Sequence, residues 1–280
     1  MDGCYSSTTF PSGIAPWKLL SFSFWPGREH PLGLKWQLSP EDYSALGHGE
    51  TTYLGYSIEN ACAQYPIVPH ERRKNDAYVL AKLLTFFTVR RNRAWAPEVM
   101  DAATHATGVR YVLGAQNDTN EGDWGPVELP KEYVNLGEMG QDAFLESLRH
   151  TKVLVGMGNP MPSPTPYDAL CLGVPFINQI RDWDPDNRED RTHWDPQHAP
   201  LSRLAPPYVY NVRAGDTKGF VSAVKGAMER PIGHFIPEQM RMESVERRLN
   251  IILEQDWESE GVQALKDWQA RFVVGQTSAP

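Results

Sequence analysis

Cysteine and long apolar runs are both scarce in this chain, and each absence excludes a class of protein. The 280 residues include three cysteines, Cys4, Cys62 and Cys171, and none lies at the C-x-x-C spacing of a zinc or redox motif. No apolar run approaches the ~20 residues that a membrane-spanning helix needs, and no charged-then-apolar signal peptide is visible. We therefore expect neither a small disulfide-rich fold nor a membrane span within this sequence.

The chain also has fewer basic residues than acidic ones. Lysine and arginine number 27 against 35 acidic residues, which gives a formal net charge of −8. A nucleic-acid backbone would be repelled by such a protein, so no nucleic-acid partner is expected. There is no internal repeat, and a hydrophobic content of 41% supplies enough material for one or two cores.

The most informative stretch is residues 152–178, which read K-V-L-V-G-M-G-N-P-M-P-S-P-T-P-Y-D-A-L-C-L-G-V-P-F-I-N. It predicts a buried strand, a loop rich in glycine and proline, a short helix, a glycine stop and a second buried strand. Gly158 lets a ligand approach the backbone because it has no Cβ, and Gly173 is expected at the C′ position of the helix. An α/β domain uses this order to place a nucleotide at the carboxyl edge of its sheet.

The start of that helix has two interpretations, which do not exclude each other. Thr165 suits the N-cap, Pro166 the first helical position and Asp168 the third. In the first interpretation, Thr165 and Asp168 form a capping box with Asp in place of Glu or Gln. In the second, the unpaired amides near Thr165 bind an anion and the carboxylate of Asp168 accepts hydrogen bonds from a ribose.

Strands and helices alternate along the rest of the chain. Strands are predicted at 78–84, 109–113, 133–136 and 208–212, helices at 93–107, 141–150, 216–230, 237–255 and 258–273, and a polar loop at 116–130. This alternation predicts an α/β fold, a Rossmann-like parallel sheet with helices on both faces. The predicted parts are an irregular N-terminal segment (1–50), a Rossmann-like domain (51–257) and a C-terminal helix and tail (258–280).

The central stretch resembles the donor-binding half of glycosyltransferase family 18, the alpha-1,6-mannosylglycoprotein 6-beta-N-acetylglucosaminyltransferases. That family has a strand ending V-G-x-G, a proline-containing loop, a P-x-E-A helix, a glycine and a strand ending F-L-N. The matching residues are Val155, Gly156, Gly158, Pro160, Pro164, Pro166, Ala169, Gly173, Phe176 and Asn178. Asp168 stands where the family has Glu, so the charge is kept and the reach is one methylene shorter. The likeness covers roughly residues 36–257.

The resemblance implies a fold and a reaction. The fold would be the C-terminal half of a two-domain GT-B glycosyltransferase. The reaction would be an inverting, metal-independent transfer of N-acetylglucosamine from UDP-N-acetylglucosamine to the 6-hydroxyl of the α1,6-linked mannose of an N-glycan. The chain would thus be a hexosyltransferase of protein N-linked glycosylation, located in the Golgi, whose partners are a UDP-sugar donor and an N-glycan acceptor.

The general base is not identified by the sequence. The family takes that carboxylate from its N-terminal half, and no residue here matches the motif, so the chain is expected to be the donor-binding half of a larger enzyme or a truncated product. A non-catalytic nucleotide-sugar-binding module therefore stays open. So does a different sugar-nucleotide enzyme of this architecture, such as an epimerase.

Eight residues are candidates for donor binding. Lys82 ends an apolar strand and matches the family's strand-end lysine, so it is expected to hold the pyrophosphate. His198 matches the family's Q-H, and Asn178 ends a strand where its amide either reaches the ligand or satisfies a turn. The complete set is Lys82, Gly158, Asn159, Ser163, Thr165, Asp168, Asn178 and His198.

Two further features favour a structural role. Residues 181–198 are rich in Asp, His and Trp, but His193, His198, Asp190 and Asp195 match no zinc spacing, so we predict a charged surface loop and no metal. Trp183 and Trp194 of that loop are alternatively suited to stack on a sugar or on uracil. Cys171 lies on the apolar helix face, which predicts a buried thiol.

Overall fold

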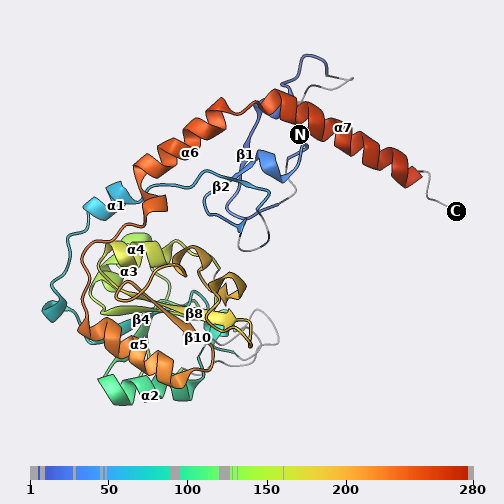
Figure 1. The fold of residues 1–280 in the computed structure, drawn as a ribbon. Coiled ribbons are helices and arrows are strands. Elements are labelled where there is room, and N and C mark those ends of the chain that lie inside the picture. Colours follow the sequence, from blue (N-terminus) through green and yellow to red (C-terminus); the bar gives the residue numbers. More distant parts are fainter. Residues whose placement is uncertain are drawn as a thin grey trace. The chain divides into compact units, whose positions relative to one another are not determined.

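The computed structural model describes residues 6, 10–27, 30–44, 47, 49–88, 95–119, 127, 129–130, 132–159 and 161–276. Cys4, Pro160, residues 93–94 and most of the predicted loop at 116–130 lie outside this set. The chain forms two compact units (Figure 1), residues 58–237 and residues 1–57 with 238–280. The unit with the main sheet is thus shorter than the predicted domain at 51–257.

The unit of residues 58–237 is built on one seven-stranded sheet. Its parallel strands run in the spatial order β10-β8-β7-β4-β5-β6, and β9 pairs antiparallel with β8. The strands are β4 (Asp76–Leu80), β5 (Arg110–Leu113), β6 (Val134–Asn135), β7 (Val153–Gly156), β8 (Phe176–Asp182), β9 (Asp195–Pro196) and β10 (Val209–Arg213). The predicted Rossmann-like parallel sheet is confirmed.

The strand order creates a switch point between β4 and β7. From β4 the chain adds β5 and β6 on one side, then crosses back to add β7, β8 and β10 on the other. Leu80 of β4 is the register partner of Gly156 of β7. Helices leave neighbouring strands at such a point on opposite faces, so a crevice opens at their carboxyl ends.

Helices cover both faces of this sheet (Figure 1). They are α2 (Pro97–Thr107), α3 (Gln141–Arg149), α4 (Thr165–Cys171) and α5 (Thr217–Glu229), while the short helix α1 (Glu59–Ala63) precedes β4 in the chain. The side chains of Val153 and Val155 join the core formed with α2 and α5, whereas the buried Leu154 between them is not part of that cluster. The two-residue alternation of a strand thus supplies both layers of core. The carboxylate of Asp216 caps α5 by accepting the Gly219 amide at 2.8 Å, as predicted.

The second unit contains more regular structure than predicted for residues 1–50. A three-stranded parallel sheet is formed by β1 (Ser21–Phe22), β2 (Gln37–Ser39) and β3 (Thr52–Tyr53). The helices α6 (Met242–Glu254) and α7 (Trp257–Gln276) belong to the same unit. Arg248 of α6 donates to the carbonyls of Leu54 (2.7 Å) and Gln239 (2.8 Å), so an arginine far along the chain holds β3.

Short 3-10 turns connect these elements. They are Pro16–Lys18, Leu34–Trp36, His70–Arg72, Leu84–Phe87, Arg191–His193, Ala199–Leu201 and Glu238–Met240. A strand was predicted at 78–84, but β4 covers Asp76–Leu80 and the turn at Leu84–Phe87 follows. None of the helices in the described part of the chain combines the length and apolarity that a membrane span requires.

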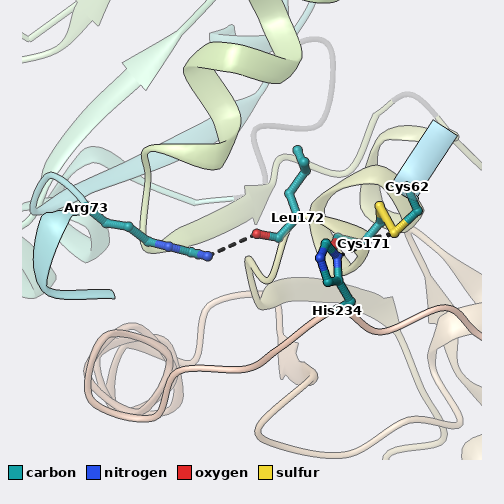
Figure 2. The surroundings of a disulfide bond; sticks show 5 residues. All are labelled: Cys62, Arg73, Cys171, Leu172 and His234. Atoms are coloured by element: carbon teal, nitrogen blue, oxygen red, sulfur yellow. Dashed lines mark hydrogen bonds between the residues drawn. A yellow bond between two sulfur atoms is a disulfide. The ribbon is translucent and has the colours of Figure 1, made fainter. Parts of the chain in front are cut away.

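The prediction for Cys171 is wrong in one respect. Cys171 is buried, but it forms a disulfide with Cys62, 109 residues earlier in the chain (Figure 2). The bond ties α1 to the end of α4. His234 lies beside it and donates from Nδ1 to the carbonyl of Cys171 at 2.6 Å. The pairing was not predictable from spacing because the two helices meet only in the folded unit.

Candidate functional site

A cavity of about 430 Å³ lies at the carboxyl edge of the sheet, beside the switch point. Lys82, just beyond β4, and Thr165, the first residue of α4, both line it. Gly114 and Gln116, which follow β5, form another part of its wall. The volume is within the range of small-molecule and cofactor sites.

The wall of this cavity combines rings with a few polar groups. Phe86, Phe144 and Tyr78 contribute aromatic surface, and Gln116 and Glu138 contribute an amide and a carboxylate. Burial raises the pKa of Tyr78 to about 12, so its phenol stays neutral at physiological pH. Aromatic surface beside hydrogen-bonding groups suits a nucleotide base, because a base presents a flat face and a polar edge.

Lys82 occupies the position that the sequence predicted. Its side chain is exposed, while its backbone carbonyl accepts the Gln116 amide at 2.9 Å. The backbone therefore holds the residue in the wall of the cavity, and its side chain remains exposed. A cation at this point is suited to a diphosphate.

The loop after β7 is less available than predicted. Gly158 has a φ of 84°, as its lack of a Cβ allows, but its amide already donates to Oε1 of Gln197 at 2.9 Å. Ser163 is buried, and its hydroxyl accepts the Thr165 amide at 3.4 Å. Asn159 is half-buried. The Gly158 amide is therefore not free for a phosphate.

The predicted cap at Thr165 does not form. Thr165 is the first helical residue of α4, Pro164 holds the N-cap position, and no side chain caps the helix there. The capping box with Asp168 is therefore absent, and α4 has only seven residues. Thr165 instead lines the cavity, and its Oγ1 accepts a hydrogen bond from the Ser163 hydroxyl at 3.3 Å. Gly173 has the positive φ (73°) predicted for the residue after the helix.

Asp168 is separated from the other candidates. It does not line the large cavity but a much smaller one, of about 10 Å³, with Cys62, Cys171 and Tyr65. Burial raises the pKa of Asp168 to about 7. The carboxyl group therefore lies on the side of α4 that carries the disulfide, away from Lys82.

The raised pKa of Asp168 predicts that the stability of the fold depends on pH. Because the pKa of Asp168 is higher in the folded chain than its ordinary value of 3.8, the folded state binds the proton more tightly than the unfolded state. The stability that this group contributes should be fully present below about pH 4 and should be lost as the pH rises through about 7. Asp168→Asn should flatten this slope in urea titrations made at each pH. A slope unchanged in the variant would contradict the assignment.

Asn178 and His198 bind each other rather than the cavity. Asn178 is 0% exposed; its Nδ2 donates to the His198 carbonyl (3.1 Å) and its Oδ1 accepts the His198 amide (3.0 Å). His198 is 1% exposed, and burial lowers its pKa to about 4. Of the two interpretations of Asn178, the structural one therefore fits the geometry.

The Asp- and His-rich segment is held by its own pairs. His193 Nδ1 lies 3.0 Å from Asp190, and Asp195 pairs with Arg181, whereas His198 is buried elsewhere. Trp194 lines a second cavity of about 370 Å³, not the large one. In the described part of the chain, the grouping with metal-ligand geometry is Cys62, Cys171 and His234, whose two sulfurs are bonded to each other.

Sequence reasoning missed several wall residues. Gln116 and Glu138 stand just beyond the ends of β5 and β6, which is the signal that identified Lys82, but Gln116 was predicted only as part of a loop and Glu138 was given no role. Phe144 of α3 also lines the cavity and was not among the candidates. Gln197 was noted only as part of a motif, and nothing in the sequence shows that it binds Gly158.

A sequence model of glycosyltransferase family 18 matches residues 18–270, which is most of the chain. The chain belongs to glycosyltransferase family 18. This family 18 chain is 23% identical over 243 residues to alpha-1,6-mannosylglycoprotein 6-beta-N-acetylglucosaminyltransferase A of Homo sapiens, covering 81% of this chain and 30% of that protein. It is 23% identical over 147 residues to alpha-1,6-mannosylglycoprotein 6-beta-N-acetylglucosaminyltransferase of Caenorhabditis elegans, covering 49% and 22%.

The family 18 chain thus spans under a third of the length of these relatives. Among solved structures, it is similar to AviGT4, a glycosyltransferase involved in avilamycin A biosynthesis, with a TM-score of 0.46 and 13% identity over 97% of this chain and 72% of that one. It is also similar to UDP-GlcNAc 2-epimerase from Methanocaldococcus jannaschii, with a TM-score of 0.44 and 12% identity over 78% and 62%.

Proposed function

We propose that this chain binds the donor of an N-acetylglucosaminyltransferase that branches N-glycans. The reaction is the transfer of N-acetylglucosamine from UDP-N-acetylglucosamine to the 6-hydroxyl of the α1,6-linked mannose, with inversion and without a metal ion. The observation that carries the proposal is the 430 Å³ cavity at the switch point of a family 18 chain. The names of the relatives supply the sugar and the linkage.

In this cavity the aromatic wall receives the uracil and Lys82 faces the diphosphate. The cationic ammonium stabilises the charge that develops on UDP as the glycosidic bond breaks. Inversion requires the acceptor oxygen to attack the opposite side of the anomeric carbon while a carboxylate takes its proton. No residue of this chain is assigned as that carboxylate.

Replacing Lys82 by alanine should weaken UDP binding about tenfold or more, because a hydrogen bond between charged groups is lost. Isothermal titration calorimetry with UDP and with UDP-N-acetylglucosamine measures the change. Lys218→Ala, which removes an exposed lysine of α5, is the matched control and should bind like the wild type. Equal affinities in the two variants would remove Lys82 from the site.

The absence of a metal requirement is tested in the same titration. We expect EDTA to leave UDP affinity unchanged, because Lys82 takes the place that a divalent cation holds in metal-dependent transferases. Loss of binding in EDTA, restored by Mn²⁺ or Mg²⁺, would contradict the metal-free reaction.

A binding module without catalysis is the second candidate. It is favoured by the small fraction of the relatives' length that the chain spans. Turnover of UDP-N-acetylglucosamine with a biantennary N-glycan acceptor separates the two candidates. Binding without turnover supports the module, and transfer by the isolated chain would show that the base lies within it.

The proposed location is the Golgi lumen, as for a branching enzyme of N-glycans. The Cys62–Cys171 disulfide supports it, because such bonds persist in oxidising compartments and are rare where thiols are kept reduced. Alkylation of free thiols in living cells, followed by a non-reducing peptide map, tests this location. A pair found reduced in the cell would argue against the secretory pathway.

A further inference from the structure

Residues 195–198 form a short strap that is fastened to β8 at several points. Asp195 and Pro196 make up β9, which pairs antiparallel with β8, and the amide of Gln197 donates to the Gln179 carbonyl at 2.8 Å. The backbone of His198 is held in both directions by the side chain of Asn178. The strap is therefore fixed to the sheet by backbone and side-chain bonds.

Two side chains reach from this strap to the loop between β7 and α4. Oε1 of Gln197 accepts the Gly158 amide at 2.9 Å, and Nε2 of His198 lies 3.1 Å from the carbonyl of Ser163. Gln197 is 2% exposed, so these bonds are made away from water. A Cβ at Gly156 would collide with Oε1 of Gln197, so the glycine of the V-G-x-G pattern leaves the room that this contact needs.

The protonation of His198 follows from its surroundings. A carbonyl oxygen only accepts, so Nε2 carries the proton and donates it to Ser163. Burial disfavours the charged ring, and Nδ1 has no hydrogen-bond partner in the described structure. Tyr167 and Phe176 meet the ring edge-on. The single polar link from the ring to the loop is therefore the bond to Ser163.

One end of this loop lines the cavity, and the other follows a strand that pairs with a lining residue. Its first end follows Gly156, the register partner of Leu80, and Leu80 lines the cavity. Its other end is Thr165, which lines the cavity and contacts the Ser163 hydroxyl. The position of Ser163 therefore sets the position of the cavity wall at Thr165.

We propose that Gln197 and His198 are positioning residues that hold the loop at 158–165 in the shape that binds the donor. They act through Gly158 and Ser163 and do not touch the donor themselves. Asn178 acts one step further away, because it fixes the backbone of His198. This role rests on the proposed function, since it assumes that the cavity beside Thr165 receives a nucleoside diphosphate.

The test separates the loss of one bond from a general loss of stability. His198→Leu removes the donor to Ser163, whereas His198→Gln restores a side-chain N–H of similar reach. Gln197→Met removes the acceptor for Gly158 at nearly constant shape, and does not depend on the folding of the His198 variant. Val224→Ala, at a buried core position of α5, is the control that lowers stability without changing a residue of the strap or of the cavity wall.

UDP affinity, melting temperature and hydrogen exchange are measured on the full chain for each variant. We expect His198→Leu and Gln197→Met each to weaken UDP binding about tenfold. In the Gln197→Met variant, hydrogen exchange of the Gly158 amide should also become faster. His198→Gln should bind within about threefold of the wild type, and Val224→Ala should melt lower with unchanged affinity.

Four outcomes would overturn the proposal. If the wild type, His198→Leu and Gln197→Met all bind UDP equally well, the positioning role is wrong and the proposed function stands. The same holds if His198→Gln fails to restore affinity, or if Val224→Ala loses as much affinity as the strap variants at the same melting temperature. A wild type that does not bind UDP overturns the proposed function and this role with it.

Discussion

Loss of the Cys62–Cys171 disulfide is expected to lower the free energy of unfolding by about 5 kcal/mol. The bond joins residues 109 apart, and cross-linking so long a loop removes much of the conformational entropy of the unfolded chain. Urea denaturation of the double variant Cys62→Ser/Cys171→Ser, compared with the wild type, measures the difference. Dithiothreitol should produce a similar shift in the wild type.

The third cysteine provides the control for this experiment. Cys4→Ser should leave the urea midpoint unchanged, and a non-reducing peptide map should join the peptides of Cys62 and Cys171. A wild-type midpoint that dithiothreitol does not move would contradict the expected stabilisation. Because the bond anchors α4, whose first residue lines the cavity, the reduced chain should also bind UDP more weakly.

Replacement of Arg73 is expected to cost at least about 3 kcal/mol, because it leaves several buried carbonyls without a donor. Arg73 is 6% exposed, and its guanidinium donates to the carbonyls of Val68 (2.9 Å), Leu172 (3.0 Å) and Gly173 (2.6 Å), with a longer bond to Thr151 (3.4 Å). Figure 2 shows the bond to Leu172, close to the disulfide. The side chain thus satisfies carbonyls at the end of α4 that the helix itself leaves open.

The neighbouring arginine is a matched control. Arg72 is exposed, so Arg72→Met should change the free energy of unfolding by less than about 0.5 kcal/mol, whereas Arg73→Met should show the full loss. Arg73→Lys should lie between them, because one ammonium cannot reproduce the forked geometry of a guanidinium. Urea titration of the three variants gives the order. Similar midpoints for Arg72→Met and Arg73→Met would show that Arg73 is not a structural donor.

Local pattern was enough for most of the elements that build the sheet. The apolar run at 153–155 became β7, Asp216 caps α5, and Gly173 has the left-handed backbone that its place after α4 required. These features depend on residues next to one another in the chain, where periodicity and capping rules apply. The position of Lys82 at the carboxyl edge followed in the same way, from the end of an apolar strand.

The separation of Asp168 from Lys82 could not be predicted in this way. The direction of a side chain on a short helix depends on how the helix packs in the folded unit, and every residue of α4 except Asp168 is buried. Thr165 was predicted as a cap, yet the Ser163 hydroxyl accepts its amide instead. Which group accepts the Thr165 amide depends on the local backbone before α4, and helix propensities do not predict it.

By itself, the amino-acid sequence determined the strand and helix periodicity of the main unit and the lysine just beyond the carboxyl end of β4. It also carried the likeness to family 18, because each of these depends on residues close together in the chain or on a pattern in order along it. Only the tertiary structure decided that Cys62 meets Cys171, that Asp168 lies away from the cavity, and that His198 and Asn178 support a loop. Those arrangements arise where segments distant in sequence pack together, so they depend on the whole fold.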